Sequence, residues 1–235
     1  MCTRYSLTSP QEATRTYFRC VRDHAFPPRY NIAPTQPVSI VRTGADNARE
    51  LVLVRWGLIP AWVKDPNDFG TLLNARAETA LEKASFKVAM RHRRCLIPAD
   101  AYYEWTGTPG AKRPHMIARA GTPSLFAMAG LWEHWMGAEG SEMETMAILT
   151  VAANATTCTL GDRMPAIVPE SAFDRWLDVR EVRDREAWEL LRPAPADLLR
   201  VTELLPAIND PRCEGADLQI PAHARNAQAK PPTFL

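Results

Sequence analysis

The segment between residues 94 and 154 constrains the fold most, because four strand-forming stretches follow one another there with no helical pattern between them. They are RCLIPADAYYEW, HMIARA, LFAMAGLWEHW and ETMAILTVAAN, and turns rich in Gly, Pro and Lys separate them. Upstream, PVSIVR and ELVLVRWGLIP enclose the turn GADNAR and predict a β-hairpin. Parallel sheets need long, usually helical, crossovers between strands, so this order predicts a mostly antiparallel sheet rather than a doubly wound one.

Helical patterns flank the strand-rich middle of the chain. Residues 10–21 begin with a proline behind a capping serine, and residues 84–93, PESAFDRWLD and DREAWELLR also have helical spacing. We therefore expect an α+β fold. Residues 2–222 should form a single domain with a curved, partly closed, mostly antiparallel β-sheet flanked by helices. The polar, Pro- and Ala-rich end, residues 223–235, is expected to be disordered.

The composition narrows the class of protein. The 235 residues are 46% hydrophobic and 23% charged, which suits a globular domain with ample core. The start, MCTRYSLTSPQEATR, lacks the apolar region of a signal peptide, and no run approaches the roughly 18 apolar residues of a membrane span. We therefore expect a cytoplasmic protein without membrane contact. The net charge of +1 does not by itself indicate nucleic-acid binding, although 23 of the 28 basic residues are arginines, a bias that a GC-rich coding sequence also produces.

Five cysteines occur at wide spacings, and no pair forms a CxxC motif. Their odd number and their spacing argue against a disulfide framework and a zinc site, so we expect no metal and no organic cofactor. Cys95 and Cys158 lie beside apolar runs and are expected to be small buried residues. Cys2 stands apart because it directly follows the initiator methionine.

Position 2 gives Cys2 a chemistry that an internal cysteine lacks. Methionine aminopeptidase removes Met1 when the next side chain is small, which leaves Cys2 as the first residue. Its thiol then has an ordinary pKa of about 8.5 and its α-amine a pKa of about 7.7–8.0, so a substantial fraction of the amine is neutral near pH 7. A 1,2-aminothiol condenses with an aldehyde and closes a stable thiazolidine ring. The alternative is that residue 2 is an accident of a frayed terminus, and its position alone leaves both interpretations open.

Polar groups interrupt otherwise apolar stretches at four places, and buried polar groups are costly unless they have partners. The four are RYN at 29–31, NAR at 74–76, YYEW at 102–105 and GDRMP at 161–165. Glu104 lies among aromatic residues, which would desolvate its carboxyl, raise its pKa and suit it to acid or base catalysis near neutrality. The alternative is an exposed carboxylate at a strand edge. Asn74 could orient a reacting group through its amide, or could be an ordinary turn asparagine.

Two further residue types have alternative interpretations. Arg76 could bind a phosphate, but an ion pair with Glu78 is the commoner outcome for this spacing. Trp56 and Trp62 could stack on nucleic-acid bases, or could belong to the core or a cavity wall.

Taken together, six motifs resemble the SRAP family, the SOS response-associated peptidases, in their order and spacing. They are MCTRY, RYNIAP, WGLIPAW, NARAET, RCLIPADAYYEW and DRMPAIV, and the resemblance covers about residues 2–220. The resemblance implies that the cysteine behind Met1 becomes the first residue, by limited autoproteolysis or removal of Met1. It then captures the ring-opened aldehyde of an abasic site in single-stranded DNA, and the product is a thiazolidine DNA–protein crosslink that shields the lesion.

The resemblance also implies roles for particular residues. Cys2 would be the nucleophile, Asn74 would hold the Cys2 amine or the sugar, and Glu104 would be the acid and base that opens the sugar ring and moves protons. The residues expected to contact DNA phosphates are Arg4, Arg76 and Arg163. Those expected to wall the DNA channel are Asn31, Trp62, Met164 and Pro165. The partner would be single-stranded DNA containing abasic sites, and a monomer is expected.

Three positions depart from the family pattern. Thr3 replaces a glycine beside the nucleophile, and Ala84 occupies a position that is often basic, with Lys83 next to it. Gly161 stands where the family pattern has an active-site histidine implicated in strand scission or crosslink reversal. We therefore expect crosslinking to survive while lyase and reversal activities are in doubt. His134 is the tempting replacement for the missing imidazole, although a histidine in a bulky strand is more often structural.

Two alternatives remain beside covalent capture of DNA. A cysteine-dependent peptidase would need an imidazole to deprotonate the thiol and an oxyanion hole, and the expected histidine is missing. A non-catalytic single-stranded DNA-binding module would follow if Gly161 marks the decay of the active site.

Overall fold

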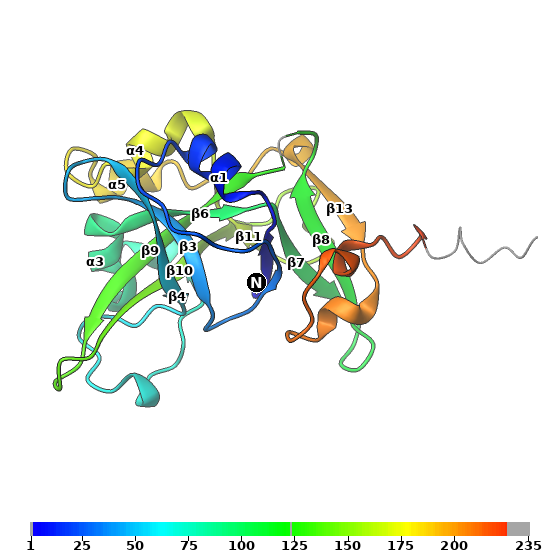
Figure 1. Cartoon of the computed structure of the whole chain (residues 1–235), viewed down its shortest axis with the longest axis horizontal. Coiled ribbons are helices and arrows are strands. Elements are labelled where there is room, and N and C mark those ends of the chain that lie inside the picture. Colours follow the sequence, from blue (N-terminus) through cyan, green and yellow to red (C-terminus); the bar gives the residue numbers. More distant parts are fainter. Residues whose placement is uncertain (1, 123, 225–235) are drawn as a thin grey trace, which may run out of the picture.

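The computed structural model describes residues 2–122 and 124–224, and within them the strands form two sheets. The larger sheet has eight strands and occupies the left of Figure 1. Its members are β3 (Pro37–Thr43), β4 (Arg49–Trp56), β5 (Asn74–Arg76), β6 (Arg94–Ala99), β9 (Phe126–Met136), β10 (Glu142–Ala152), β11 (Arg163–Pro165) and β12 (Ile167–Val168). Five of these strands close into a barrel in the order β10, β4, β3, β6 and β9, because β10 pairs with both β4 and β9.

The barrel is mixed rather than wholly antiparallel. The pairs β3–β4, β3–β6, β6–β9 and β9–β10 are antiparallel, as expected, whereas β10 runs parallel to β4 and to β5. The smaller sheet, at the right of Figure 1, is antiparallel and has the order β13-β8-β7-β1-β2. Its strands are β1 (Tyr5–Leu7), β2 (Arg29–Ile32), β7 (Ala101–Thr106), β8 (Arg113–Arg119) and β13 (Leu199–Glu203). The α+β class and the partly closed, mostly antiparallel sheet are confirmed, but the strands divide between two sheets.

Asp100 explains why RCLIPADAYYEW is two strands and not the one that its pattern predicts. The chain leaves the barrel at Ala99 and enters the smaller sheet at Ala101. The Asp100 carboxylate is 5% exposed and accepts hydrogen bonds from the backbone N–H groups of Thr8 and Ser9 at 2.7 and 2.8 Å. It also accepts bonds from the hydroxyls of Ser9 and Ser124, both at 2.6 Å. Because these tertiary partners fix the corner, a pattern in the local sequence does not reveal it.

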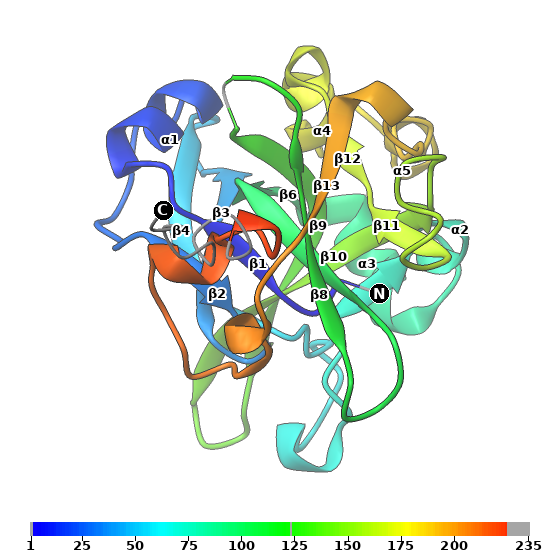
Figure 2. The ribbon, with the colours of Figure 1, turned by 90° about the vertical axis from the view of Figure 1, so that its right-hand side faces the viewer.

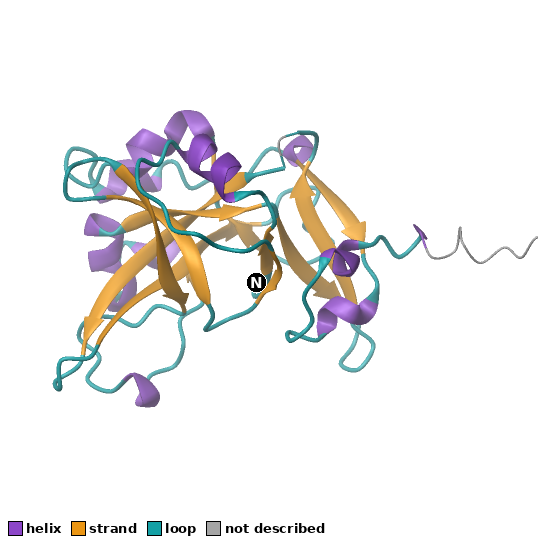
Figure 3. Cartoon of the chain, in the orientation of Figure 1, coloured by secondary structure: helices purple, strands orange, loops and turns teal. Residues whose placement is uncertain are grey.

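Short helices cover the barrel, as the colouring by secondary structure shows (Figure 3). They are α1 (Gln11–Phe18), α2 (Ala77–Ala80), α3 (Ala84–His92), α4 (Phe173–Leu177) and α5 (Asp184–Trp188). Five 3₁₀ turns accompany them within the described residues, at Pro66–Asp68, Glu170–Ala172, Ala196–Leu198, Pro206–Asn209 and Ala216–Gln219. The helix predicted over residues 10–21 ends early, because Arg19 adopts a left-handed conformation (φ 54°) and caps it. The predicted tail 223–235 lies outside the described residues except for its first two.

Burial decides the predictions for three side chains. Trp56 is fully buried and its indole N–H donates to the Leu73 carbonyl at 3.1 Å, so it is a core residue. Cys95 is buried as expected. The expectation for Cys158 is wrong, since this residue lies exposed in the turns that follow β10. Among the described residues no helix is long and apolar enough to cross a membrane.

Strand β1, which follows Cys2, lies on the side of the smaller sheet nearest the barrel (Figure 1), with β2 beside it (Figure 2). Strand β1 pairs with β2 on one side and with β7 on the other, and Tyr5 stands opposite Tyr102. The Tyr103 N–H donates to the Arg4 carbonyl at 3.0 Å, which continues the pairing toward residue 2. Cys2 is thereby fixed beside β7 and is not at a frayed end.

Candidate functional site around Cys2

Cys2 is fully buried at the junction between the sheets. Its thiol lies 3.6 Å from the Arg4 carbonyl oxygen. Burial raises the pKa of this thiol far above its ordinary value, and the negative charge of Glu104 raises it further. The thiol therefore rests in its protonated form and needs a base when it reacts.

Glu104 supplies a buried carboxyl beside this thiol. It lies two residues after Tyr102 on β7, so both side chains point to the same face of the strand, the face that packs on the main core. Only 9% of Glu104 is exposed, and burial raises its pKa, with the nearby Asp162 acting in the same direction. The interpretation of Glu104 as an exposed edge carboxylate is therefore wrong. A carboxyl with a raised pKa can both donate and accept protons near neutrality.

Asn74 holds the main chain of the same cysteine. It opens β5, which pairs in parallel with β10 and so brings residue 74 alongside the amino terminus. The Asn74 Nδ2 donates to the Cys2 carbonyl oxygen at 2.9 Å. Its Oδ1 is buried without a hydrogen-bond partner among the described residues, so an acceptor remains available at the site.

Three residues far apart in the sequence thus meet at one place: a thiol on the amino-terminal segment, a carboxyl on β7 and an amide on β5. This is the set of groups that acid–base chemistry on a carbonyl compound needs. Within residues 2–122 and 124–224, no group of three or more His, Cys, Asp or Glu residues could hold a metal ion.

Arg4 and Asn31 belong to the support of the site. Arg4 is 9% exposed, and its guanidinium donates to the Asn31 side-chain oxygen and to the carbonyl oxygens of Ile208 and Asn209. The amide of Asn31, itself fully buried, donates to the Asp210 carbonyl at 2.9 Å. The two residues therefore tie the strands next to Cys2 to the segment after β13. This geometry does not favour the expected phosphate contact of Arg4 or a place for Asn31 in a channel wall.

Arg76 and Arg163 lie near each other because β5 and β11 both pair with the end of β10. Arg163 forms a two-pronged ion pair with Glu78 at 2.6 and 2.8 Å, and its side chain is only 12% exposed. Glu78 therefore pairs with Arg163 and not with Arg76, contrary to the commoner outcome for the spacing. Arg76 is exposed. It is thus the better placed of the two to meet a phosphate.

The remaining predicted channel residues separate into buried and exposed ones. Met164 is fully buried and Pro165 is also buried, so both pack behind the surface. Trp62 is 58% exposed and meets Phe69 edge-on, with ring centroids 5.6 Å apart. An exposed tryptophan supported by the half-buried Phe69 suits stacking on unpaired bases.

The departure at Gly161 leaves room for a side chain. A Cβ atom placed there would meet no heavy atom within 4 Å. The adjoining Asp162 acts on the charge of Glu104, so this turn borders the site. His134 does not replace the missing histidine, since it lies far along β9 and pairs with Glu142 at 3.3 Å.

Sequence reasoning missed His115. This residue stands directly opposite Glu104 in the β7–β8 hairpin and is 8% exposed. The hairpin register would have revealed the pairing, but the length of the TGTPGAK turn leaves several registers possible.

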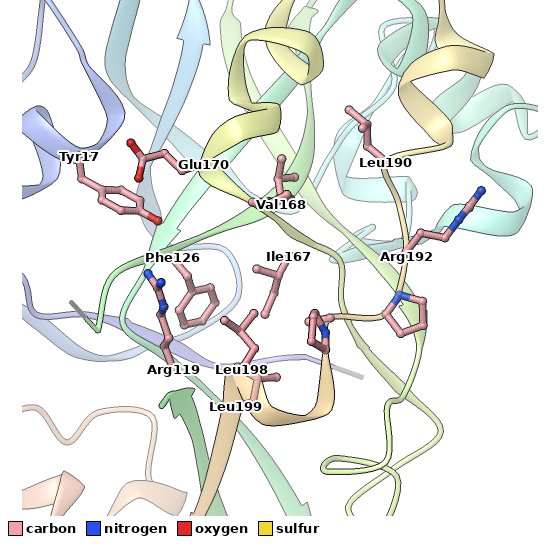
Figure 4. A pocket seen from close by; sticks show the side chains of 14 residues that line it. Tyr17, Arg119, Phe126, Ile167, Val168, Glu170, Leu190, Arg192, Leu198 and Leu199 are labelled. Carbon is pink, nitrogen blue, oxygen red and sulfur yellow. The ribbon is translucent and has the colours of Figure 1, made fainter. Parts of the chain in front are cut away.

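A separate apolar pocket of ≈ 360 Å³ opens elsewhere on the molecule (Figure 4). Side chains of α1, β12 and the segment before β13 line it, including Tyr17, Ile167 and Leu198, with Arg119 reaching toward Tyr17. Cys2, Asn74 and Glu104 are not among its lining residues, so this pocket is distinct from the site around Cys2.

Comparisons with known proteins agree with the motifs. The chain is 33% identical to the abasic site processing protein YoqW of Bacillus subtilis over 222 residues. This alignment covers 93% of this chain and 98% of the relative. It is 35% identical to the abasic site processing protein HMCES of Gallus gallus over 205 residues. That alignment covers 74% of this chain and 61% of the relative.

A crystal structure of a protein from Bacteroides thetaiotaomicron has the same fold. It superposes with a TM-score of 0.80 at 26% identity and covers 89% of this chain and 97% of the other. The family model described as SOS response associated peptidase matches residues 1–211. With this match and relatives of more than 30% identity along most of its length, the chain belongs to the SOS response associated peptidase (SRAP) family.

Proposed function

We propose that this protein processes abasic sites by covalent capture. After loss of Met1, the amine and thiol of Cys2 condense with the ring-opened aldehyde of an abasic site in single-stranded DNA and form a thiazolidine crosslink. The observation that carries the proposal is the meeting of Cys2, Glu104 and Asn74, in which Asn74 bonds the Cys2 carbonyl at 2.9 Å and Glu104 lies close enough to raise the pKa of the thiol.

The proton movements follow from the burial of these groups. The amine attacks the aldehyde carbon and gives a carbinolamine, whose hydroxyl leaves as water when Glu104 donates a proton. The thiol then attacks the resulting iminium carbon as its proton passes to the Glu104 carboxylate. One water is released in all, and Glu104 regains the proton that it gave. A carboxyl with an ordinary pKa would be almost wholly ionised at pH 7, and the raised pKa of Glu104 suits it to the donating step.

The surroundings supply features for holding DNA. Arg76 is exposed near β10 and can meet a phosphate, and the exposed Trp62 with Phe69 can stack on bases. Arg163 contributes through its ion pair with Glu78, which fixes the strand end on which it lies. The relatives named abasic site processing proteins support the same substrate class.

The test is adduct formation with a single-stranded oligonucleotide that carries one abasic site. The purified protein should form a heat-stable adduct, and Cys2→Ser should form none while it still binds the strand. An adduct from Cys2→Ser would refute the proposal. Hydrolysis of a peptide that is lost in Cys2→Ala would instead support the peptidase alternative, and equal salt-sensitive binding of intact and abasic strands without any adduct would support the binding module.

A further inference from the structure

Three ionisable side chains form a row across the smaller sheet. In the register of β7, β8 and β13, His115 stands opposite Glu104 on one side and opposite Glu203 on the other. Directly opposite residues in antiparallel strands point to the same face, with Cβ atoms about 4.5–5.5 Å apart. The row therefore begins at the buried carboxyl beside Cys2 and runs along one face of the sheet.

The row ends in solvent. Glu104 is 9% exposed and the side chain of His115 is 10% exposed, whereas that of Glu203 is 42% exposed. The Nε2 of His115 lies 3.9 Å from the Glu203 carboxylate. The Nδ1 of His115 is buried and has no hydrogen-bond partner within the described part of the chain. One ring nitrogen thus faces an exposed acid, and the other is available to a group inside.

Few other charged groups act on this row. Arg113, on the same strand as His115, lies 3.7 Å from the Glu203 carboxylate at the outer end of the row. At the inner end burial raises the pKa of Glu104, the amino-terminal charge lowers it, and Asp162, from the turn that contains Gly161, raises it by a smaller amount. The histidine is therefore flanked by one acid from β7 and one from β13.

We propose that His115 relays protons between Glu104 and solvent by way of Glu203, an assignment that rests on the proposed capture of abasic sites. A protonated Glu104 passes its proton through a bridging water to the Nδ1 of neutral His115, which becomes an imidazolium, because Nδ1 has no hydrogen-bond partner of its own within the described residues. The other nitrogen then releases a proton to Glu203 or to water, and the ring returns to its neutral form. Glu104 is left ionised and ready to accept the hydroxyl proton of the abasic sugar as its ring opens, and no oxidant or other reactant is consumed.

The relay answers a requirement of the site. In the capture steps Glu104 gives and regains one proton, but opening of the sugar ring begins with Glu104 as a base. Because burial favours the protonated form of Glu104, that step requires its proton to reach bulk water first. His115 acts through Glu104 and does not touch the substrate, so it is a positioning residue and not a catalytic one.

The experiment measures the single-turnover rate of adduct formation from pH 5 to 9 with an oligonucleotide carrying one abasic site. We expect His115→Gln to slow the reaction about tenfold near pH 7 and to change the shape of the pH profile. Glu203→Gln, at an exposed position, should show a smaller change in the same direction. His134→Gln removes the other strand histidine that faces an acid and should leave rate and profile unchanged.

A double-mutant cycle separates a relay from mere packing. If His115 works through Glu104, then His115→Gln should add no further slowing in a Glu104→Gln background, whereas an independent structural defect would add its own factor. A rate and pH profile of His115→Gln equal to those of the unchanged protein would overturn the relay and leave the proposed capture intact. Should His115→Gln fail to fold, a Glu203→Gln variant with an unchanged rate and profile would overturn it. If the unchanged protein forms no adduct, the proposed function fails and the relay falls with it.

Discussion

Replacing Asn74 by alanine tests how the site is held together. The substitution removes the 2.9 Å hydrogen bond to the Cys2 carbonyl oxygen and leaves that partly buried oxygen without its donor. Leaving a buried acceptor unsatisfied costs about 1–3 kcal/mol, and the partial exposure of this contact places the loss near the lower end, at about 1 kcal/mol. If the same contact orients Cys2 during the reaction, a loss of about 1 kcal/mol slows adduct formation roughly fivefold.

Two measurements check the Asn74→Ala prediction. Thermal unfolding should show a midpoint lower by about 2–4 °C, the shift that about 1 kcal/mol produces in a domain of this size. A gel time course with an abasic oligonucleotide should show the slower reaction. Asn67→Ala is the matched control, because Asn67 is exposed and its contact to Asp65 is made by its backbone N–H rather than its side chain. If Asn74→Ala and Asn67→Ala react and melt alike, the role derived for Asn74 is refuted.

Three further substitutions test the remaining features. Because burial raises the pKa of Glu104, the unchanged protein loses stability as the pH rises from the ordinary carboxyl pKa to the raised one. Glu104→Gln should remove this loss, so in thermal melts from pH 4 to 8 the variant should gain stability relative to the unchanged protein only at the upper end. Equal dependence of the two melting midpoints on pH would contradict this prediction. Gly161→His should have a melting midpoint within about 2 °C of the original, because a Cβ atom at this position meets no heavy atom within 4 Å. Gly57→Ala is the contrasting control and should be markedly destabilised, because Gly57 has a φ of 129° and its new Cβ would clash with Thr71. Trp62→Ala should weaken binding of single-stranded DNA by about 1–3 kcal/mol without changing the melting midpoint. Trp56→Ala, at a buried tryptophan, should instead destabilise the core by about 3–5 kcal/mol. If a titration shows that Trp62→Ala binds DNA as tightly as the unchanged protein, a stacking role for Trp62 is excluded.

Local patterns predicted the individual strands and most helices of this protein, but not their arrangement. The β3–β4 hairpin and the helix at 84–92 follow from alternation and helical spacing within short windows. Closure of the barrel depends on β10 meeting both β4 and β9, which is a contact between distant segments. The corner at Asp100 depends on hydrogen bonds from Thr8, Ser9 and Ser124. The alternation of apolar and polar residues around Asp100 does not indicate these distant partners.

In the candidate site, too, the sequence indicated the individual residues but not the partners that they contact. Cys2, Asn74 and Glu104 could be singled out because their residue types and positions are unusual for the stretches in which they lie. The partners of the arginines could not be predicted. Arg4 donates hydrogen bonds to carbonyl groups more than 200 positions away in the sequence. Glu78 forms its ion pair with Arg163 and not with Arg76, which is its near neighbour in the sequence. Hydrogen-bond partners of long polar side chains are set by tertiary geometry, so a sequence indicates that such a residue is present but not what it binds.

The most direct test of covalent capture is the intact mass of the purified protein before and after incubation with a single-stranded oligonucleotide bearing one abasic site. The account predicts a starting mass that lacks Met1, followed by a heat-stable species that equals protein plus oligonucleotide minus one water. It also predicts that Cys2→Ser gives no such species. A chain that lacks Met1, binds the strand and forms no adduct would contradict the central claim.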